Sequence, residues 1–302
     1  MPLSIKNLPK EEILLQPGHA ACPGCPIGIG LRIVGKVLGK RTVIVVPACC
    51  TSIIQGPYPY SAIKVPLVNV IFAASAAVAS GIASAFEAMG VRDVNVVVWA
   101  GDGGTADIGL QALSGAAERN DNIIYICYDN EAYMNTGIQR SSSTPYKAWT
   151  TTTVTGKQEF KKNVPAIVAQ HRIPYVATAS IGYPLDFAEK LQKASKIKGF
   201  KYIHLLAPCP VGWRFDPSLT IEVGKLAVLT GLWPLYEVEN GVFRLTSISL
   251  GLLDKSRRVP VEKYLRLQGR FKHITDEDIK VYEEYVDQLW EVLRKLHGKK
   301  IV

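Results

Sequence analysis

The sequence predicts an α/β fold with a mostly parallel sheet and helices on both of its faces. Short runs rich in Val and Ile recur along the chain, and Gly-containing turns and helix-like stretches separate them, as in repeated strand–helix units. Of the 302 residues, 48% are hydrophobic and 20% are charged. This composition allows one large core or two small ones and excludes disordered, collagen-like and disulfide-framework proteins. The predicted strands are residues 42–46, 94–99, 123–128, 175–179 and 202–206.

Residues 65–86 form an uncharged stretch of 22 residues, which is long enough to cross a bilayer. The stretch is rich in Ala, Ser and Gly, and such small side chains gain little from contact with lipid. They also let a helix approach its neighbours closely. We therefore expect a tightly packed, buried helix here and no transmembrane segment.

The middle of the chain predicts one helix and one long loop. Residues 105–119 carry apolar side chains at helical spacing, at Ile108, Leu110 and Leu113 among others. Residues 139–157 are polar, rich in Thr and without periodicity, which predicts a long ordered loop. Such loops in compact proteins are more often functional than idle.

The pattern changes after residue 220. Less regular, Pro-containing sequence leads to a final amphipathic helix that begins after Thr275 as its N-cap and ends near Leu296. We therefore divide the chain into a ligand-binding domain, residues 1–220, and a C-terminal extension, residues 221–302. The extension is a candidate for docking to another subunit, and packing of its helix on its own domain explains the pattern equally well.

The net charge of +9 and the pI near 9.2 suit an acidic partner protein, an anionic substrate or a nucleic acid, and charge alone does not choose among them. The first 20 residues lack the apolar segment and the cleavage site of a secretory signal. A cytoplasmic enzyme is the expectation, with neither a membrane nor a nucleic acid as its partner.

A Gly-Asp-Gly-Gly run follows the predicted strand 94–99 and precedes the predicted helix. Asp102 therefore falls at the carboxyl end of a parallel strand, where open α/β sheets bind ligands. Gly103 and Gly104 let backbone N–H groups approach an anion closely. Asn130 follows the next strand, so its side-chain oxygen is placed to join Asp102 around a hard cation. The pattern predicts a diphosphate held through Mg²⁺.

Four of the six cysteines are candidates for metal ligands. Cys22 and Cys25 form a Cys-Pro-Gly-Cys pair, and Cys50 and Cys209 each follow a predicted strand. Four thiolates fit either a structural zinc ion or a [4Fe–4S] cluster, and their spacing does not separate the two. Cys127 lies within an apolar strand and is expected in the core.

The segment from Gly101 to Pro145 resembles the beta subunit of 2-oxoacid:ferredoxin oxidoreductases, of the pyruvate and branched-chain types. The residues that carry the resemblance are AGDGGTADIGLQALSGAAERN and YDNEAYMNTGIQRSSSTP, and the similarity extends over essentially the whole chain. It implies the diphosphate-domain fold of thiamine diphosphate enzymes. It also identifies the Gly-Asp-Gly run and the Asn that follows it as a thiamine diphosphate motif.

The resemblance assigns roles to particular residues. It implies that Asp102 and Asn130 bind Mg²⁺ by their side chains and Ala132 by its carbonyl oxygen, with Gly103 and Gly104 against the cofactor. Asn135 then lies near the reacting atoms as the catalytic candidate. The local alternative for Asn135 and Thr136 is an ordinary turn stabilised by side-chain to backbone hydrogen bonds. Further residues of the implied cleft are Tyr133, Met134 and Thr136. The implied ligands of a [4Fe–4S] cluster are Cys22, Cys25, Cys50 and Cys209, with Cys50 in preference to its neighbour Cys49.

The implied activity is oxidative decarboxylation of a small 2-oxoacid, with electron transfer to ferredoxin. Other subunits are implied partners, and coenzyme A is a further candidate. The glutamate that activates the aminopyrimidine ring comes from another subunit or domain in this family, so we assign no catalytic base. Ala73 follows Phe72 where relatives carry Glu, which leaves pyruvate, a branched-chain 2-oxoacid or oxalate as the substrate.

Two other classes of protein share part of this pattern. A non-redox thiamine diphosphate decarboxylase or synthase with a structural zinc site would explain Asp102 and Asn130, and it needs no set of four cysteines. A zinc-stabilised binding module would explain the cysteines and would leave Asp102 and Asn130 without a role. A brown colour from iron and sulfur separates the expected class from both.

Overall fold

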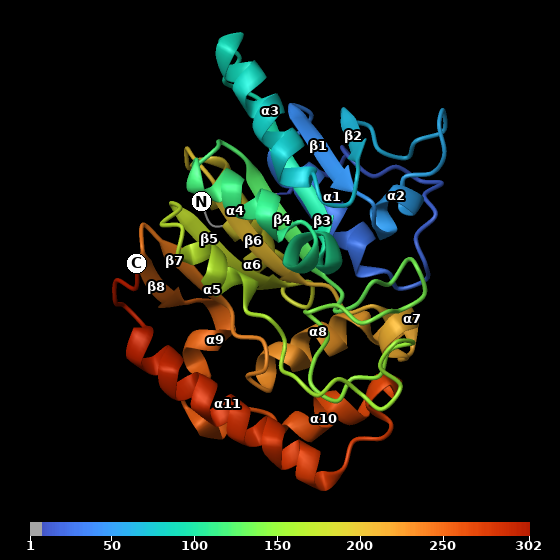
Figure 1. Cartoon of the computed structure of the whole chain (residues 1–302), viewed down its shortest axis with the longest axis vertical. Coiled ribbons are helices and arrows are strands. Elements are labelled where there is room, and N and C mark those ends of the chain that lie inside the picture. Colours follow the sequence, from blue (N-terminus) through green and yellow to red (C-terminus); the bar gives the residue numbers. More distant parts are fainter. Residues whose placement is uncertain (1–7) are drawn as a thin grey trace.

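The computed structural model describes residues 8–302. Within them, eight strands form a single sheet in the order β2-β1-β3-β4-β6-β5-β7-β8 (Figure 1). The first six strands in this order run parallel to one another. Strand β7 pairs antiparallel with β5, and β8 pairs antiparallel with β7. The strands are β1 (Thr42–Pro47), β2 (Leu67–Val70), β3 (Asn95–Gly101), β4 (Ile124–Asp129), β5 (Tyr175–Ser180), β6 (Lys201–Leu206), β7 (Tyr236–Glu239) and β8 (Val242–Leu245).

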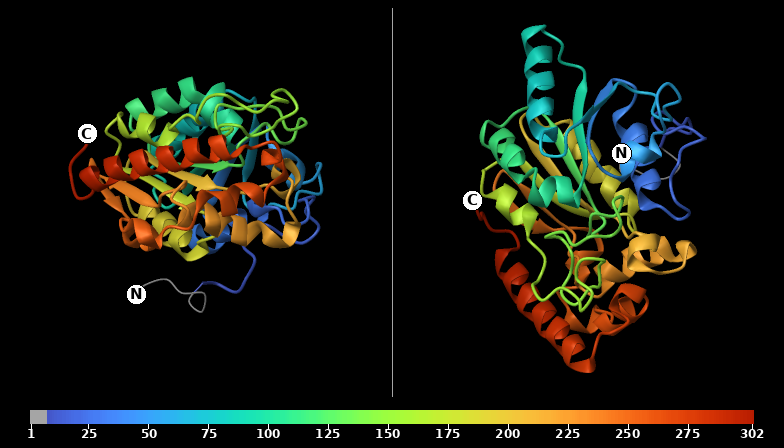
Figure 2. Two further views of the ribbon diagram at one scale, coloured as in Figure 1. Left: turned by 90° about the horizontal axis from the view of Figure 1, so that it is seen from below. Right: turned by 45° about the vertical axis from the view of Figure 1, so that its right-hand side comes forward.

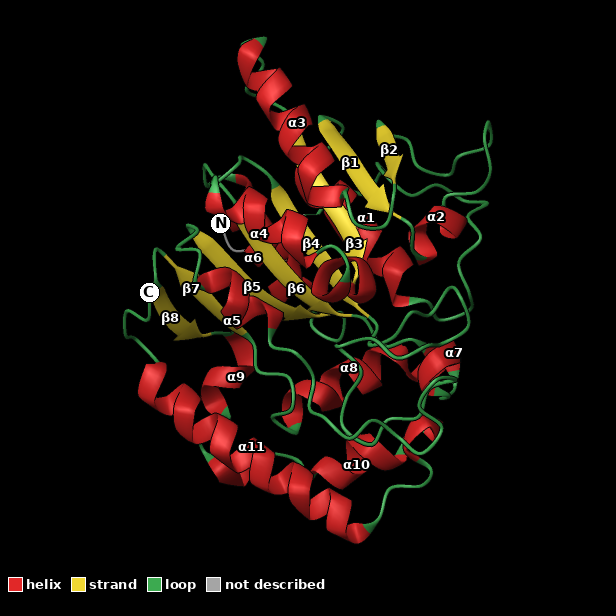
Figure 3. Cartoon of the chain, in the orientation of Figure 1, coloured by secondary structure: helices red, strands yellow, loops and turns green. Residues whose placement is uncertain are grey.

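Helices cover both faces of the sheet, as the sequence predicts (Figures 2 and 3). Two hydrophobic clusters lie on its two sides, one including residues of α1 and α6 and the other residues of α3, α4, α5, α8, α10 and α11. The helices are α1 (Pro26–Leu38), α2 (Cys50–Ile54), α3 (Ser75–Ala88), α4 (Leu110–Glu118), α5 (Val164–Ala169), α6 (Pro184–Ser195), α7 (Pro210–Trp213), α8 (Thr220–Leu229), α9 (Ser247–Gly251), α10 (Val261–Arg266) and α11 (Asp276–Leu296).

The five predicted strands are confirmed as β1, β3, β4, β5 and β6. Their side chains are buried along almost their whole length because helices pack on both faces. Cys127 is fully buried in β4, which confirms its place in the core. The segment 139–157 contains neither a helix nor a strand, so the predicted loop is also confirmed.

The prediction of one buried helix over residues 65–86 was wrong. The stretch divides into β2 and α3, because Leu67–Val70 pairs in parallel with β1 before the Ala-rich part begins. The buried residues of α3 lie in the first half of the helix. The rest of the helix projects past the edge of the sheet (Figure 1). In the part of the chain that the structure describes, no helix has the length and hydropathy needed to cross a membrane.

The helix predicted over residues 105–119 forms as two pieces. A π-helical turn, η2, spans Gly103–Asp107, and α4 follows it. The carbonyl oxygen of Gly104 lies where a Cβ on Gly109 would stand, at 1.8 Å, so the break between the pieces depends on a glycine. The wide first turn sets the direction in which the chain leaves Asp102.

Residues 221–302 join the same sheet through β7 and β8, and α11 packs over it. Thr275 caps α11 as predicted, with reciprocal hydrogen bonds between Thr275 and Asp278. Val286, Trp290 and Leu293 of this helix are buried in the hydrophobic cluster of that face. The boundary at residue 220 stays a prediction, and so does the docking role of this region.

Candidate cofactor and metal site

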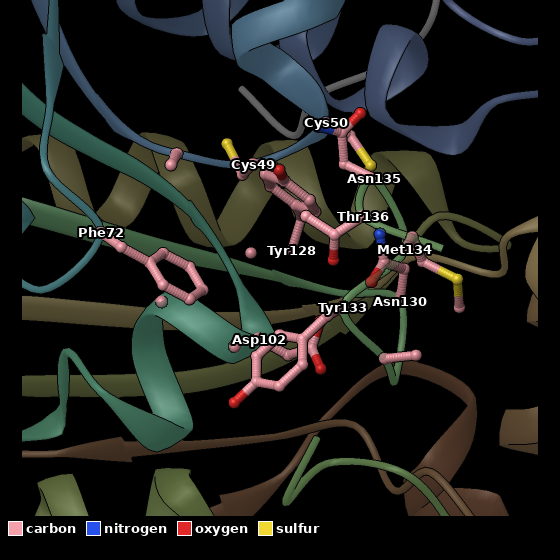
Figure 4. A pocket seen from close by; sticks show the side chains of 15 residues that line it. Cys49, Cys50, Phe72, Asp102, Tyr128, Asn130, Tyr133, Met134, Asn135 and Thr136 are labelled. Atoms are coloured by element: carbon pink, nitrogen blue, oxygen red, sulfur yellow. The ribbon is translucent and has the colours of Figure 1, made fainter. Parts of the chain in front are cut away.

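A pocket of about 270 Å³ opens at the carboxyl ends of β1, β3 and β4 (Figure 4). Nine of its lining residues are the nine predicted to contact the cofactor, namely Asp102, Gly103, Gly104, Asn130, Ala132, Tyr133, Met134, Asn135 and Thr136. The fold therefore brings all of the predicted cofactor residues together. Their roles stay predictions, because the geometry places side chains without showing what they bind.

The pocket forms where β3 and β4 end side by side. Gly101 at the end of β3 is paired with Tyr128 near the end of β4, so Asp102 and Asn130 follow from neighbouring strand ends. Gly103 is needed for the close approach of Tyr133, since a Cβ at position 103 would stand 2.0 Å from the tyrosine ring. The Tyr133 hydroxyl donates a hydrogen bond to Asp107 at 2.6 Å, which holds the ring over η2.

Three oxygen atoms converge at the floor of this pocket. The amide oxygen of Asn130, as placed, lies 2.9 Å from Oδ1 of Asp102 and 3.0 Å from the carbonyl oxygen of Ala132. Adjacent ligands in an octahedral Mg²⁺ site with bonds of about 2.0–2.1 Å are separated by roughly 2.9 Å. Acceptor oxygens at this spacing repel one another unless one of two conditions holds. Either a cation lies between them, or the Asn130 amide is rotated so that its nitrogen donates to the other two oxygens. The donor set therefore fits Mg²⁺.

The Asp102 carboxyl group is buried, and its surroundings disfavour its charged form. Burial raises the pKa of Asp102 well above its usual range, and the nearby Asp129 carboxylate raises it further, whereas a hydrogen bond from Ser141 opposes both. The Ser141 hydroxyl donates to Oδ2 of Asp102 at 2.5 Å, so it orients the carboxylate while Oδ1 faces Asn130. A bound cation would restore the charged form, because it would replace the solvation lost on burial.

The two residues flanking Asn130 are carboxylates that take no part in this oxygen cluster. Lys161 donates to both Asp129 and Glu131 at 2.8 Å. Burial alone would raise the pKa of Asp129, but Lys161 and His204 outweigh it and hold the pKa below the usual range. Sequence reasoning missed Lys161 and His204, because ion pairs between distant residues have no spacing pattern.

The segment from Tyr133 to Gln139 forms the mouth of the pocket. Asn135 and Thr136 are exposed there, and the Thr136 hydroxyl donates to the side-chain oxygen of Gln139 at 2.6 Å. This contact joins two side chains, and the Gln139 amide also donates to the Thr136 carbonyl oxygen at 2.7 Å, a side-chain to backbone bond of the kind that the local alternative predicts. Met134 packs against Gly212, where an added Cβ would stand 2.1 Å from the sulfur, so α7 closes one side of the segment.

The four candidate cysteines lie on three chain segments. Cys25 and Cys209 are the N-cap residues of α1 and α7, and Cys50 begins α2. Cys22 joins Cys25 through a turn in which the Cys25 N–H donates to the Cys22 carbonyl oxygen at 3.1 Å. Helix N-termini supply N–H groups to thiolates, as the contact from the Gly212 N–H to the Cys209 sulfur at 3.5 Å shows.

Burial raises the pKa values of Cys25 and Cys50, and neighbouring thiols contribute to the shifts. Burial raises the pKa of Cys25 to about 11, and the thiolates of Cys209 and Cys22 add to the shift. Burial also raises the pKa of Cys50, with further contributions from Cys209, Cys49 and Cys25. Within residues 8–302, no three His, Cys, Asp or Glu side chains are already arranged around one point as ligands of a metal ion.

Other contacts fix the Cys22–Cys25 turn beside the segment that follows Cys209. The Thr220 hydroxyl donates to the Gly24 carbonyl oxygen at 2.7 Å. Gly24 has a φ of +68° and lies against Pro217, which leaves no room for a side chain. Gly24, which lies between Cys22 and Cys25, is thus held against Pro217 and Thr220 in the region after β6.

Apart from the predicted cluster ligand Cys50, five lining residues of the pocket were not predicted as site residues. Tyr128 is 1% exposed, and its hydroxyl has no hydrogen-bond partner within the described residues. Its position at the end of a predicted strand beside Asp129 and Asn130 was the signal that could have identified it. The others are Ala48, Cys49, Phe72 and Gly101.

Comparison with known proteins identifies the family of this chain. Residues 50–205 match the family described as thiamine pyrophosphate enzyme, C-terminal TPP binding domain. The pyruvate synthase subunit PorB of Methanothermobacter thermautotrophicus is 56% identical, and the match covers 95% of this chain and 99% of that protein. The ketoisovalerate oxidoreductase subunit VorB of Pyrococcus furiosus is 54% identical, with 98% of each chain covered.

A solved structure shares the fold. It is the 2-oxoglutarate:ferredoxin oxidoreductase from Magnetococcus marinus, with a TM-score of 0.58 and 24% identity over 74% of this chain and 84% of that chain. The matches to PorB and VorB extend along nearly the full length of those two proteins. The chain belongs to the family of the PorB and VorB beta subunits of 2-oxoacid:ferredoxin oxidoreductases.

Proposed function

We propose that this chain binds Mg²⁺, thiamine diphosphate and a [4Fe–4S] cluster in a complex that oxidatively decarboxylates a small 2-oxoacid and reduces ferredoxin. The observation that carries the proposal is that Cys50 lines the same pocket as Asp102 and Asn130. A ligand of a one-electron carrier would then stand on the wall of the cofactor pocket. Bound thiamine diphosphate supplies the electron sink that lets carbon dioxide leave a 2-oxoacid.

The convergent oxygens support the metal part of the proposal. Asp102, Asn130 and the carbonyl oxygen of Ala132 would hold Mg²⁺, and the cation would bridge to the diphosphate. Ser141 would keep Asp102 turned toward the metal. Gly103 and Gly104 would let the cofactor approach the backbone, because a side chain at position 103 would collide with Tyr133.

The mouth of the pocket would face the substrate. Asn135 is exposed at the rim and is our candidate for the residue that touches the reacting atoms. Tyr133, Met134 and Thr136 would shape the entrance around it. The glutamate that activates the aminopyrimidine ring is expected from a partner subunit, which would also close the pocket against water.

Cys22, Cys25, Cys50 and Cys209 would hold the cluster. The hydrogen bond that holds the Cys22–Cys25 turn beside the segment after Cys209 supports this assignment, as do the N–H groups at the starts of three helices. Basic side chains of this chain, which has a net charge of +9, would favour docking of an acidic ferredoxin.

Assay of the assembled complex, purified without oxygen, tests the proposal. We expect a brown protein with iron, sulfide and thiamine diphosphate, and reduction of ferredoxin that depends on a 2-oxoacid. Pyruvate, ketoisovalerate and oxalate, each with and without coenzyme A, identify the substrate and the acyl acceptor. A colourless, zinc-containing complex that decarboxylates without reducing ferredoxin would contradict the proposal and support the non-redox alternative.

A further inference from the structure

The turn between β4 and the mouth of the pocket has the sequence Asp-Asn-Glu, and its three side chains face different surroundings. Asn130 lines the pocket, whereas Asp129 and Glu131 are buried against cationic groups. Lys161 contacts both carboxylates, at 2.8 Å to Oδ2 of Asp129 and 2.8 Å to Oε1 of Glu131. One ammonium group therefore joins the two sides of the turn.

Two further groups complete this arrangement. Arg270 lies 2.6 Å from Oε2 of Glu131, although the pair does not have hydrogen-bond geometry. His204 bonds to Oδ2 of Asp129 at 2.8 Å through Nε2, and its Nδ1 bonds to the hydroxyl of Tyr202 at 2.6 Å. Two carboxylates are thus matched by two permanent cations, Lys161 and Arg270.

The backbone of the turn is tied to the same groups. The Trp213 indole N–H donates to the carbonyl oxygen of Asn130 at 2.7 Å, and the Arg270 guanidinium lies 3.7 Å from the centre of the Trp213 ring. Glu131 has a φ of +66°, which a non-glycine residue adopts only where its surroundings hold it. The contacts of its carboxylate with Lys161 and Arg270 supply that restraint.

A second cavity of about 200 Å³ lies beside Lys161, between α5 and α11. Lys161 and His204 are among its lining residues, and the Lys161 ammonium lies 4.6 Å from the centre of the Trp233 ring. Both polar groups are already bonded to Asp129, so neither offers an unmatched charge to a ligand there. The contacts of Lys161 point to a role at the turn.

Two charged carboxylates next to a metal ligand have opposite effects on the two parts of a metal–diphosphate complex. They attract a divalent cation, and they repel the diphosphate, whose phosphate oxygens carry negative charge. Without a matching cation, Asp129 and Glu131 would therefore favour the metal ion alone over its complex with a diphosphate. The effect is strong because the groups are buried, where water screens charges poorly.

We propose that Lys161 is a positioning residue of this site, which neutralises Asp129 and Glu131 so that the turn presents Asn130 to the metal and accepts the diphosphate. The inference rests on the proposed Mg²⁺–thiamine diphosphate site and names a residue outside the pocket on which that site depends.

The test uses the assembled complex with oxidised clusters, stripped of thiamine diphosphate and divalent cations. Thiamine diphosphate binding is measured by equilibrium dialysis at saturating Mg²⁺, and Mn²⁺ binding without the cofactor is measured by electron paramagnetic resonance. In Lys161→Met we expect roughly tenfold weaker binding of thiamine diphosphate and equal or tighter binding of Mn²⁺. A loss of packing alone would weaken both.

Further variants separate charge from structure. Lys161→Arg should restore cofactor binding because it keeps the cation. Lys161→Met combined with Asp129→Asn should also recover most of it, since the unmatched charge is removed. The matched control is Lys193→Met, because Lys193 likewise bridges two carboxylates, Glu237 and Glu239, at 2.9 and 2.8 Å. This control should bind both ligands as the wild type does.

Two results would overturn the inference. One is cofactor binding by Lys161→Met within about twofold of the wild type, and the other is a parallel loss of cofactor and Mn²⁺ that Asp129→Asn does not relieve. Failure of the proposed function is distinguishable from both, because the wild-type complex itself would then bind no thiamine diphosphate in the presence of Mg²⁺.

Discussion

The side chains of Asp102 and Asn130 meet at 2.9 Å, although they follow different strands and are 28 positions apart in the sequence. Parallel neighbours β3 and β4 bring them together, because the two strands end at the same edge of the sheet. The contact is between two oxygen atoms as placed, and either a divalent cation or a rotated Asn130 amide would stabilise it.

Removal of either proposed metal ligand, Asp102 or Asn130, should release the cofactor. Asp102→Ala removes a charged ligand worth about 2–3 kcal/mol, so we expect thiamine diphosphate to bind roughly a hundredfold more weakly at limiting Mg²⁺. Asn130→Ala removes a neutral ligand and should cost roughly tenfold. Cofactor content after gel filtration of the assembled complex measures both.

The control for this pair is Asp93→Ala, which removes an exposed carboxylate that pairs with Arg41. It should retain as much cofactor as the wild type. Equal cofactor content in Asp102→Ala and the control would show that the metal is not held at this edge of the sheet.

Substitution of the four candidate cysteines should reduce bound iron. Replacement of Cys22, Cys25, Cys50 or Cys209 by Ser removes a soft thiolate ligand, so we expect a large loss of iron or a cluster that decays rapidly. Cys127→Ser is the matched control, since Cys127 is buried in the core of β4. Iron and sulfide analysis of the complex gives the readout, and full iron occupancy in Cys209→Ala would exclude Cys209 as a ligand.

Two glycine substitutions should change stability in opposite directions. In Gly103→Ala the new methyl group meets Tyr133, so the free energy of unfolding should fall by about 1–3 kcal/mol and the pocket should lose cofactor. Gly81 lies exposed within α3, where an added Cβ meets nothing within 4 Å. Gly81→Ala should therefore raise the free energy of unfolding by about 0.5–1 kcal/mol. Denaturant titration compares them, and equal effects would contradict the packing of Tyr133.

The stability of the fold should rise with pH above neutrality because of Lys201. Burial lowers the pKa of Lys201 to about 7 from its ordinary value of 10.5. Between these two values the unfolded chain binds a proton that the folded chain does not bind, so this lysine contributes more stability as the pH rises. Below pH 7 both forms carry the proton and the full penalty for burying the charge remains.

Comparison with Lys201→Met isolates this effect. The variant lacks the buried charge, so its unfolding free energy relative to the wild type should be highest at pH 6 and should decline toward pH 10. The Lys201 amine also donates to the side chain of Asn122 at 2.8 Å, and loss of this bond affects the comparison at every pH. A stability difference that does not vary with pH would show that Lys201 stays charged in the fold.

The chain alone should be inactive. The proposed pocket lacks an assigned base for the cofactor ring, and we expect a partner subunit to supply it across the mouth formed by residues 133–139. The isolated chain should be brown and bind thiamine diphosphate weakly, without 2-oxoacid-dependent reduction of ferredoxin or a viologen dye. Addition of the partner subunits should restore reduction, and substantial turnover by the isolated chain would show that it carries its own activating acid.

Features set by local sequence could be predicted. The parallel strands are continuous apolar runs because both of their faces are buried, and the residues at their ends could be placed at one edge of the sheet. The Gly-Asp-Gly run and the Cys-Pro-Gly-Cys pair are recognisable without a structure. From these, the positions of Asp102 and Asn130 in one pocket followed.

The hairpin of β7 and β8 could not be recognised by the same criterion. It lies at the edge of the sheet, and charged residues such as Glu237, Glu239 and Arg244 interrupt its apolar pattern. Its turn has Asn240 and Gly241 at positive φ, and an Asn-Gly pair between short apolar runs was the available signal. The division of residues 65–86 was hidden because the absence of charge continued across two elements.

The contacts of Lys161 lay beyond sequence reasoning altogether. Its partners Asp129 and Glu131 are 32 and 30 positions away in the sequence. Lys161 itself lies in a loop, and no hydrophobic periodicity predicts the course of that loop. A lysine followed by a second lysine in a polar segment has the pattern of a solvated surface. Only the hydrogen bonds seen in the folded chain show that Lys161 contacts the turn that carries Asn130.

A crystal structure of the assembled complex, purified without oxygen and recorded at the iron absorption edge, tests the central claim most directly. We predict anomalous density for iron among the sulfur atoms of Cys22, Cys25, Cys50 and Cys209, and a divalent cation with a diphosphate at Asp102, Asn130 and the carbonyl oxygen of Ala132. A zinc ion at the cysteines, or a diphosphate bound away from Asp102, would contradict the account.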